Sequence, residues 1–132
     1  MQDSELLSLA RQTAVNAYCP YSKFAVGAAV LWQDDSISVG VNVENASYPL
    51  GVCAERNAIA NGIAAGSKKI ALLAVGADID ATVAPCGGCR QVIYEFVADS
   101  DVRVIMGGTS DVSCQTIGEL LPNAFTPRDL LK

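Results

Sequence analysis

Two cysteines, Cys86 and Cys89, stand three residues apart in the stretch APCGGCRQV. Cysteine pairs with this spacing usually hold a metal ion or form a redox-active disulfide. The chain contains no histidine, so a metal site must be completed by other residues, and the remaining cysteines are Cys19, Cys53 and Cys114. An odd number of cysteines argues against a framework of disulfides and favours thiols kept for metal binding or catalysis.

A third ligand is available at Cys53, which begins a second predicted helix. Helix N-termini favour thiolate over thiol, and residues three apart share one helical face. Three thiolates from two helix starts suit Zn²⁺ and leave its fourth position open for water, as in a catalytic site. Two alternatives stay open. One is a closed structural site with Cys19 or Cys114 as fourth ligand, although we expect both to be ordinary buried side chains. The other is a thioredoxin-like redox pair, which leaves Cys53 without a role.

Glu55 lies two residues after Cys53 in the otherwise apolar stretch CAERNAIA. A buried carboxylate needs a partner, and here it is placed to accept a proton from water at the open position of the metal. A zinc ion with three thiolates has a net negative formal charge, which nearby positive charge would offset. Arg56, on the same helical face as Cys53, is the candidate for this role, helped by the two helix N-termini. An ordinary surface arginine is the alternative.

The apolar pattern around these residues predicts alternating helices and strands. We expect helices at 4–17, at 53–66 and, after Pro85, across 86–98, strands at 24–33, 36–43, 70–77 and 102–108, and short helical turns at 116–121 and 127–131. The first two strands suggest a hairpin, turning at Asp34-Asp35. The alternation implies an α/β fold in which helices cover both faces of a mixed sheet.

Composition limits the possible partners of the chain. Its 132 residues are 51% hydrophobic and 17% charged, which is typical of one globular domain, here 1–132. The net charge of −5, with no basic run longer than Lys68-Lys69, disfavours nucleic acid and favours a small uncharged substrate. There is no apolar stretch of about 20 residues and the start is acidic, so we expect a cytoplasmic protein without a membrane contact.

Over nearly its full length the chain resembles the small homotetrameric cytidine deaminases. The motifs that carry the resemblance are YCPYSKFAVGAAV, GVNVENASY, CAERNAI, APCGGCRQV and ELLPNAFTPRDL. The pattern Cys-Ala-Glu followed by Pro-Cys-x-x-Cys is the signature of zinc deaminases. The resemblance implies a three-layer α/β/α fold with a five-stranded mixed sheet, and zinc held by Cys53, Cys86 and Cys89. It also implies hydrolytic deamination of cytidine, and of deoxycytidine, in pyrimidine salvage, with Glu55 moving the protons.

The same resemblance implies contacts to a nucleoside. Asn42 and Glu44 would bind the ribose hydroxyls, Phe24 would lie against the nucleoside, and the N–H of Ala54 would meet the pyrimidine O2. Without the resemblance, the polar pair at 42 and 44 would be interpreted as the polar side of a strand end.

The resemblance further implies a homo-oligomer, a tetramer with shared active sites, in which Tyr48 and Phe125 complete the site of a neighbouring subunit. Phe125 would stack on the pyrimidine. Two alternative functions stay open. One is a zinc deaminase for another nucleoside or base, such as blasticidin S. The other is a zinc-stabilised binding module without turnover, for which Glu55 would be dispensable.

Overall fold

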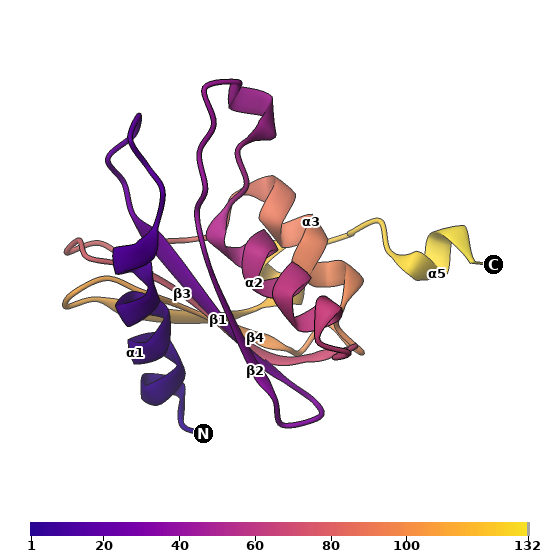
Figure 1. Cartoon of the computed structure of the whole chain (residues 1–132). Helices are drawn as coiled ribbons and strands as arrows, with labels where there is room; N and C mark the ends of the chain where they lie inside the picture. The colour runs from indigo at the N-terminus through magenta and orange to yellow at the C-terminus, as the bar shows by residue number, and fades with distance from the viewer. Residues whose placement is uncertain (132) are drawn as a thin grey trace.

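The computed structural model describes residues 1–131, which form a five-stranded sheet flanked by helices (Figure 1). The helices are α1 (Asp3–Thr13), α2 (Ala54–Ala64), α3 (Gly87–Glu95), α4 (Ile117–Leu120) and α5 (Pro127–Leu130), with 3₁₀ turns η1 (Ala14–Asn16) and η2 (Tyr48–Leu50). The strands are β1 (Val26–Trp32), β2 (Ile37–Val41), β3 (Ile70–Ala77), β4 (Arg103–Gly107) and β5 (Val112–Thr116). Within residues 1–131, no helix combines the length and the apolar character needed to cross a membrane.

The sheet is mixed, with strand order β2-β1-β3-β4-β5. Only the central β3–β4 pair is parallel, and α3 lies on the connection between these two strands. The other three pairs are antiparallel. This order brings the carboxyl end of β3 close to the start of β1, on the side of the sheet where α2 and α3 begin.

Alternating residues of β1 and β3 are buried on opposite faces of the sheet. Ala29 and Leu72 face α1 and pack with its Leu6. Val30 and Leu73 belong to the larger cluster on the other face, which includes residues of α2 and α3. Both strands are therefore almost continuously apolar, as expected for strands covered on two sides. The expected three-layer α/β/α arrangement is confirmed (Figure 1).

The strand β5 was absent from the pattern-based prediction. Its residues VSCQT are mostly polar and exposed, because β5 is the edge of the sheet and shares hydrogen bonds only with β4. An edge strand without apolar alternation gives no signal from periodicity. The predicted helices are also longer than the observed ones. The first ends at Thr13 and continues as η1, and the helix expected at 86–98 ends at Glu95.

The hairpin between β1 and β2 turns at Asp34 and Asp35, as predicted. Asp35 has φ 69°, a left-handed conformation that aspartate tolerates better than most residues. The Asp34 carboxylate accepts hydrogen bonds from the Ser36 backbone at 3.0 Å and from the Ser67 hydroxyl at 2.9 Å. A turn without glycine is therefore stabilised by side-chain hydrogen bonds.

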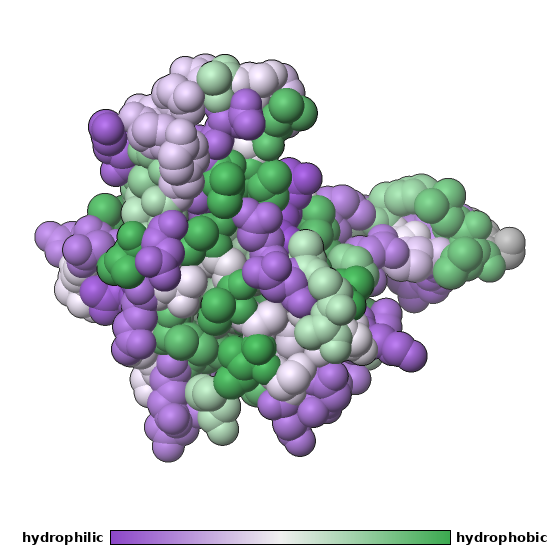
Figure 2. Space-filling model, viewed as in Figure 1, coloured by the Kyte–Doolittle hydropathy of each residue, from purple (hydrophilic) through white to green (hydrophobic). Residues whose placement is uncertain are grey.

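The C-terminal segment projects away from the sheet and carries exposed apolar side chains. Figure 1 shows α5 extending from the body of the molecule, and Figure 2 shows hydrophobic residues gathered on this projection. Leu130 is 75% exposed and Leu131 is 83% exposed. Within residues 1–131 these two side chains are therefore largely uncovered.

The seating of α2 on β2 depends on Gly40. A Cβ at residue 40 would lie 2.7 Å from the carbonyl oxygen of Ala54 and 2.8 Å from the Cα of Ala58. Both atoms are backbone atoms of α2 or its first turn, so they can yield only if the helix shifts as a whole. The helix that follows Cys53 is thus held in place by close contact of backbones.

We expect Gly40→Ala to lower the free energy of unfolding by about 1–3 kcal/mol, because it overpacks this contact. The measurement is the midpoint of denaturant unfolding. Gly88→Ala is the matched control, since a Cβ there meets no atom within 4 Å and the residue lies in a helix. Equal effects of the two substitutions would contradict the close contact.

Candidate metal centre and active site

Three cysteines converge where α2 and α3 begin. Cys53 is the N-cap of α2, Cys86 is the N-cap of α3, and Cys89 lies in the first turn of α3. Their Sγ atoms all lie within 4.8 Å of one another, and those of Cys53 and Cys86 are 4.0 Å apart. The cluster contains neither Cys19 nor Cys114, so in residues 1–131 it offers three thiols, not a closed set of four.

The expectation that Cys19 and Cys114 are both buried is wrong. Cys114 is exposed because it stands on the edge strand β5, where it accepts a hydrogen bond of 3.7 Å from the Arg103 guanidinium. Cys19 is only partly buried. Neither thiol is close to the cluster, which removes the four-cysteine alternative for the described chain.

The chemistry of the three thiols fits a divalent metal. The Cys89 backbone N–H at the helix start lowers the pKa of Cys86, as a helix N-terminus should. Burial instead raises the pKa of Cys53 and of Cys89, so desolvation outweighs the helix effect at these two residues. Three adjacent thiolates require a compensating cation, and sulfur donors at this separation suit zinc.

Glu55 lies beside the thiols on the first turn of α2 and is only 4% exposed. Burial raises the pKa of its carboxyl, opposed in part by its own backbone N–H and by the Cys89 thiol. The prediction of a buried carboxylate at this position is confirmed. A carboxyl group whose pKa lies above its usual range is suited to exchange protons with a substrate.

Arg56 follows on the same turn, but its side chain is exposed. The ion pairs found within residues 1–131 join Arg11 to Asp78 and Arg103 to Asp3, so Arg56 takes part in neither. Its role in offsetting the charge of the metal centre stays a prediction.

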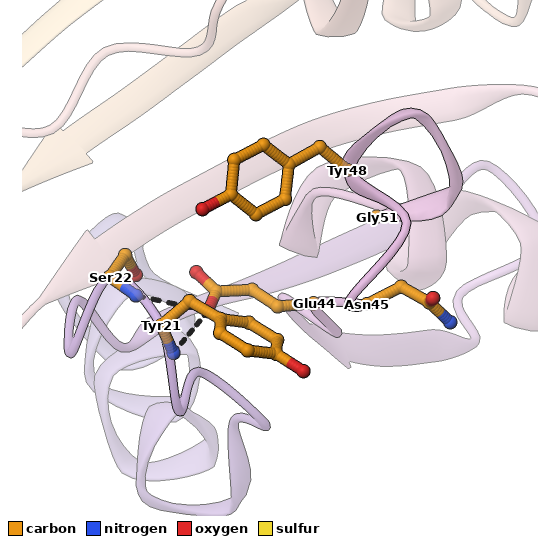
Figure 3. Close-up of a pocket in the computed structure, with 6 residues that line it drawn as sticks. All are labelled: Tyr21, Ser22, Glu44, Asn45, Tyr48 and Gly51. Atoms are coloured by element: carbon orange, nitrogen blue, oxygen red, sulfur yellow. Dashed lines mark hydrogen bonds between the residues drawn. The ribbon is translucent and has the colours of Figure 1, made fainter.

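The loops that follow η1 and β2 line a pocket of about 390 Å³ (Figure 3). Its lining residues are Tyr21, Ser22, Glu44, Asn45, Tyr48 and Gly51. The rings of Tyr21 and Tyr48 meet edge to face, with centroids 6.3 Å apart. This geometry is favourable for aromatic pairs and joins the two loops.

The Glu44 carboxylate fixes the first of these loops. Its Oε1 accepts hydrogen bonds from the backbone N–H groups of Tyr21 at 3.0 Å and Ser22 at 3.1 Å (Figure 3). The hydrogen bonds with Ser22, first among several causes, lower the pKa of Glu44. The carboxylate is thus kept ionised at the edge of the pocket.

Asn42 is bonded to the backbone on either side of residue 25. Its Oδ1 accepts from the Val26 N–H at 2.8 Å and its Nδ2 donates to the Phe24 carbonyl, also at 2.8 Å. The Phe24 side chain is 40% exposed. Hydrogen bonds from a side chain to the backbone thus tie Asn42 to the segment that carries Phe24, and the sequence did not indicate them.

Tyr48 and Phe125 have largely exposed side chains. The Phe125 carbonyl accepts a hydrogen bond of 2.8 Å from the Gln91 side chain, so α3 holds the segment that carries this ring.

The sequence patterns did not point to Gln91 or to Arg90, whose guanidinium donates to two backbone carbonyls. Their position in the sequence could have indicated them, because Arg90 and Gln91 directly follow Cys89 in APCGGCRQV.

Comparison with known proteins gives the family. The family model described as "Cytidine and deoxycytidylate deaminase zinc-binding region" matches residues 1–106. The cytidine deaminase of Halalkalibacterium halodurans is 44% identical, and the match covers 98% of each chain. That of Sporosarcina psychrophila is 41% identical and covers 98% of this chain and 96% of the relative.

A crystal structure of cytidine deaminase from Burkholderia pseudomallei has the same fold. It superposes with a TM-score of 0.89 at 41% identity, covering 95% of this chain and all of the other. Sequence, fold and the cluster of three thiols beside a buried glutamate therefore agree. The chain belongs to the cytidine and deoxycytidylate deaminase family of zinc-binding enzymes.

Proposed function

We propose that residues 1–132 form a single domain that hydrolyses cytidine, and also deoxycytidine, to uridine or deoxyuridine and ammonia, as a cytoplasmic enzyme of pyrimidine salvage. The observation that carries the proposal is the buried Glu55 beside the thiols of Cys53, Cys86 and Cys89. We assign these three cysteines as zinc ligands. Zinc, when bound, supplies a Lewis acid that makes water a sufficient nucleophile near neutral pH.

Glu55 moves the protons in this proposal. The water oxygen bonds to C4 of the pyrimidine while one water proton passes through Glu55 to N3. The remaining hydroxyl proton then passes through Glu55 to the amino nitrogen, and the C4–N4 bond breaks. The products are ammonia and a C4 carbonyl. Burial raises the pKa of Glu55, which supports a carboxylate that both accepts and returns a proton.

The nucleoside contacts proposed here use groups just before β1, just after β2 and at the start of α2. Asn42 and Glu44 bind the ribose hydroxyls. Hydrogen bonds from the Val26 N–H to Asn42 and from the Ser22 N–H to Glu44 already orient the two side chains. Phe24 lies against the nucleoside. The backbone N–H of Ala54, the first residue of α2, meets the pyrimidine O2, because a first-turn N–H has no partner within its helix.

We propose a homotetramer in which Tyr48 and Phe125 complete a neighbouring copy's site. Both side chains are exposed in the single chain, at 78% and 58%. The apolar projection around α5 supports the same arrangement, since burial against another copy would remove it from water (Figure 2).

Cytidine and deoxycytidine should be deaminated by the zinc-loaded protein, with loss of the absorbance of the amino pyrimidine and stoichiometric ammonia. Cytosine, blasticidin S and cytidine-containing oligonucleotides should react at least about tenfold more slowly at equal concentration. Preferential turnover of blasticidin S or cytosine would contradict cytidine as the substrate and favour the alternative zinc deaminase. Absence of turnover with all of them would favour a zinc-stabilised binding module.

Glu55→Gln should lower kcat by a factor of about 10²–10⁴ or more while the protein stays folded and keeps its zinc, because only proton transfer is removed. Turnover and zinc content are measured on the same preparation. Glu95→Gln, at the exposed end of α3, is the matched control and should behave as the parent. Persistent activity of the Glu55 variant would refute the mechanism.

Mixing two impaired variants tests the shared site. Phe125→Ala should raise KM, and Glu55→Gln should be inactive. If Phe125 serves a neighbour, a co-assembled mixture contains sites with Glu55 from one chain and Phe125 from another, so activity should exceed the sum of the separate variants. Additive activity, in assemblies whose mixing is verified by mass spectrometry, would place Phe125 in its own chain's site.

A further inference from the structure

Cys86 is the most exposed of the three cysteines, and little packs around the residues that follow it. It lies at the end of the long connection from β3, and a Cβ added at Gly87 or Gly88 would meet no atom within 4 Å. Packing alone therefore does not fix the direction in which the Cys86 thiol points. A metal ligand nevertheless needs a defined orientation.

Arg90 contacts the backbone on both sides of Cys86. Its backbone N–H donates to the Cys86 carbonyl at 2.9 Å, and its side-chain Nε donates to the Pro85 carbonyl at 2.8 Å. These carbonyls belong to the two peptide planes that flank the Cys86 Cα. Anchoring both planes to one residue fixes the backbone dihedrals of Cys86, φ −67° and ψ 170°, and with them the direction of its Cβ.

The guanidinium is itself anchored on the opposite side. Its Nη1 donates to the carbonyl of Leu120, the last residue of α4, at 2.9 Å. Leu120 and Pro85 both have buried side chains, so the two acceptors are fixed in the core. Arg90 is only partly exposed and is in neither ion pair of residues 1–131. The planar guanidinium of Arg90 thus donates to two backbone carbonyls and pairs with no carboxylate of residues 1–131.

We propose that Arg90 is a positioning residue that orients Cys86 for zinc by holding the Pro85 carbonyl against the carbonyl of Leu120. The inference rests on the proposed assignment of Cys86 as a zinc ligand. It deepens that assignment by naming what stabilises the least packed ligand. Outer contacts of this kind typically contribute 10–100-fold to metal affinity.

The adjacent Gln91 provides a matched control. Its side chain also donates one hydrogen bond to a backbone carbonyl of the C-terminal segment, that of Phe125 at 2.8 Å. It has no contact of this kind with residues 84–86. Loss of Gln91 should therefore disturb the segment of Phe125 and leave the orientation of Cys86 unchanged.

The test is the rate at which the zinc-loaded protein releases zinc to an excess of a chromophoric chelator, in Arg90→Met, Arg90→Lys and Gln91→Met. Arg90→Met should release zinc about 10–100-fold faster than the parent. Arg90→Lys keeps the charge but replaces the planar guanidinium, whose Nε and Nη1 face the two carbonyls in fixed geometry, with a flexible ammonium, so it should also release zinc several-fold faster. Gln91→Met should stay within about twofold of the parent and instead raise KM.

Circular dichroism establishes that each variant is folded. If Arg90→Met does not fold, the zinc release rate of Arg90→Lys, which retains an aliphatic stem, tests the proposal. Parental zinc release in the folded Arg90 variants would overturn the proposal, as would equally fast release from Gln91→Met. Cytidine turnover of the parent is measured separately. A parent that holds zinc without deaminating cytidine would refute the proposed function and leave the role of Arg90 intact.

Discussion

The site depends on one constraint, the meeting of two helix N-termini over the same face of the sheet. Cys53 and Cys86 are 33 positions apart in the chain, yet their sulfurs lie 4.0 Å apart because α2, which packs on β1 and β2, also packs against α3. Each helix places a cysteine at its N-cap, where unpaired N–H groups favour negative charge. Burial opposes that effect at Cys53 and Cys89. The centre therefore combines a dry environment with a need for a cation, which is the condition under which a metal holds thiolates.

The close packing that produces this meeting uses very small residues. Gly40 allows the backbone of α2 to lie directly on β2, and Gly27 does the same for α1 on β1. Ala54 and Ala58 line the contact on the helix side and are fully buried. Because these contacts involve backbone atoms, the position of α2 can shift little. The backbone of Glu55 is therefore also held in place, since this residue lies in the first turn of the same helix.

The loops around the site are organised differently, by side chains that bond to backbone groups. Asn42 and Glu44 hold the segment before β1, and Asn57 donates from α2 to the carbonyl of Val41 at 2.8 Å. Arg90 does the same for the loop that precedes Cys86. Polar side chains with several donors or acceptors thus replace hydrophobic packing where the chain is exposed. A loop fixed in this way can present groups to a small polar ligand without being buried itself.

The sequence by itself determined the residues of the centre and most of the elements that carry them. Cys53 with Glu55, and Cys86 with Cys89, could be identified because each pair is a short local motif at the start of a predicted helix. Strands β1 and β3 could be identified because strands buried on both faces are continuously apolar. Only the tertiary structure decided that three thiols converge without Cys114, that β5 forms the sheet edge and that Arg56 is exposed. It alone assigned Arg90 to the backbone around Cys86. The physical reason is that periodicity reports which face of an element is buried, whereas these outcomes depend on contacts between residues far apart in the chain.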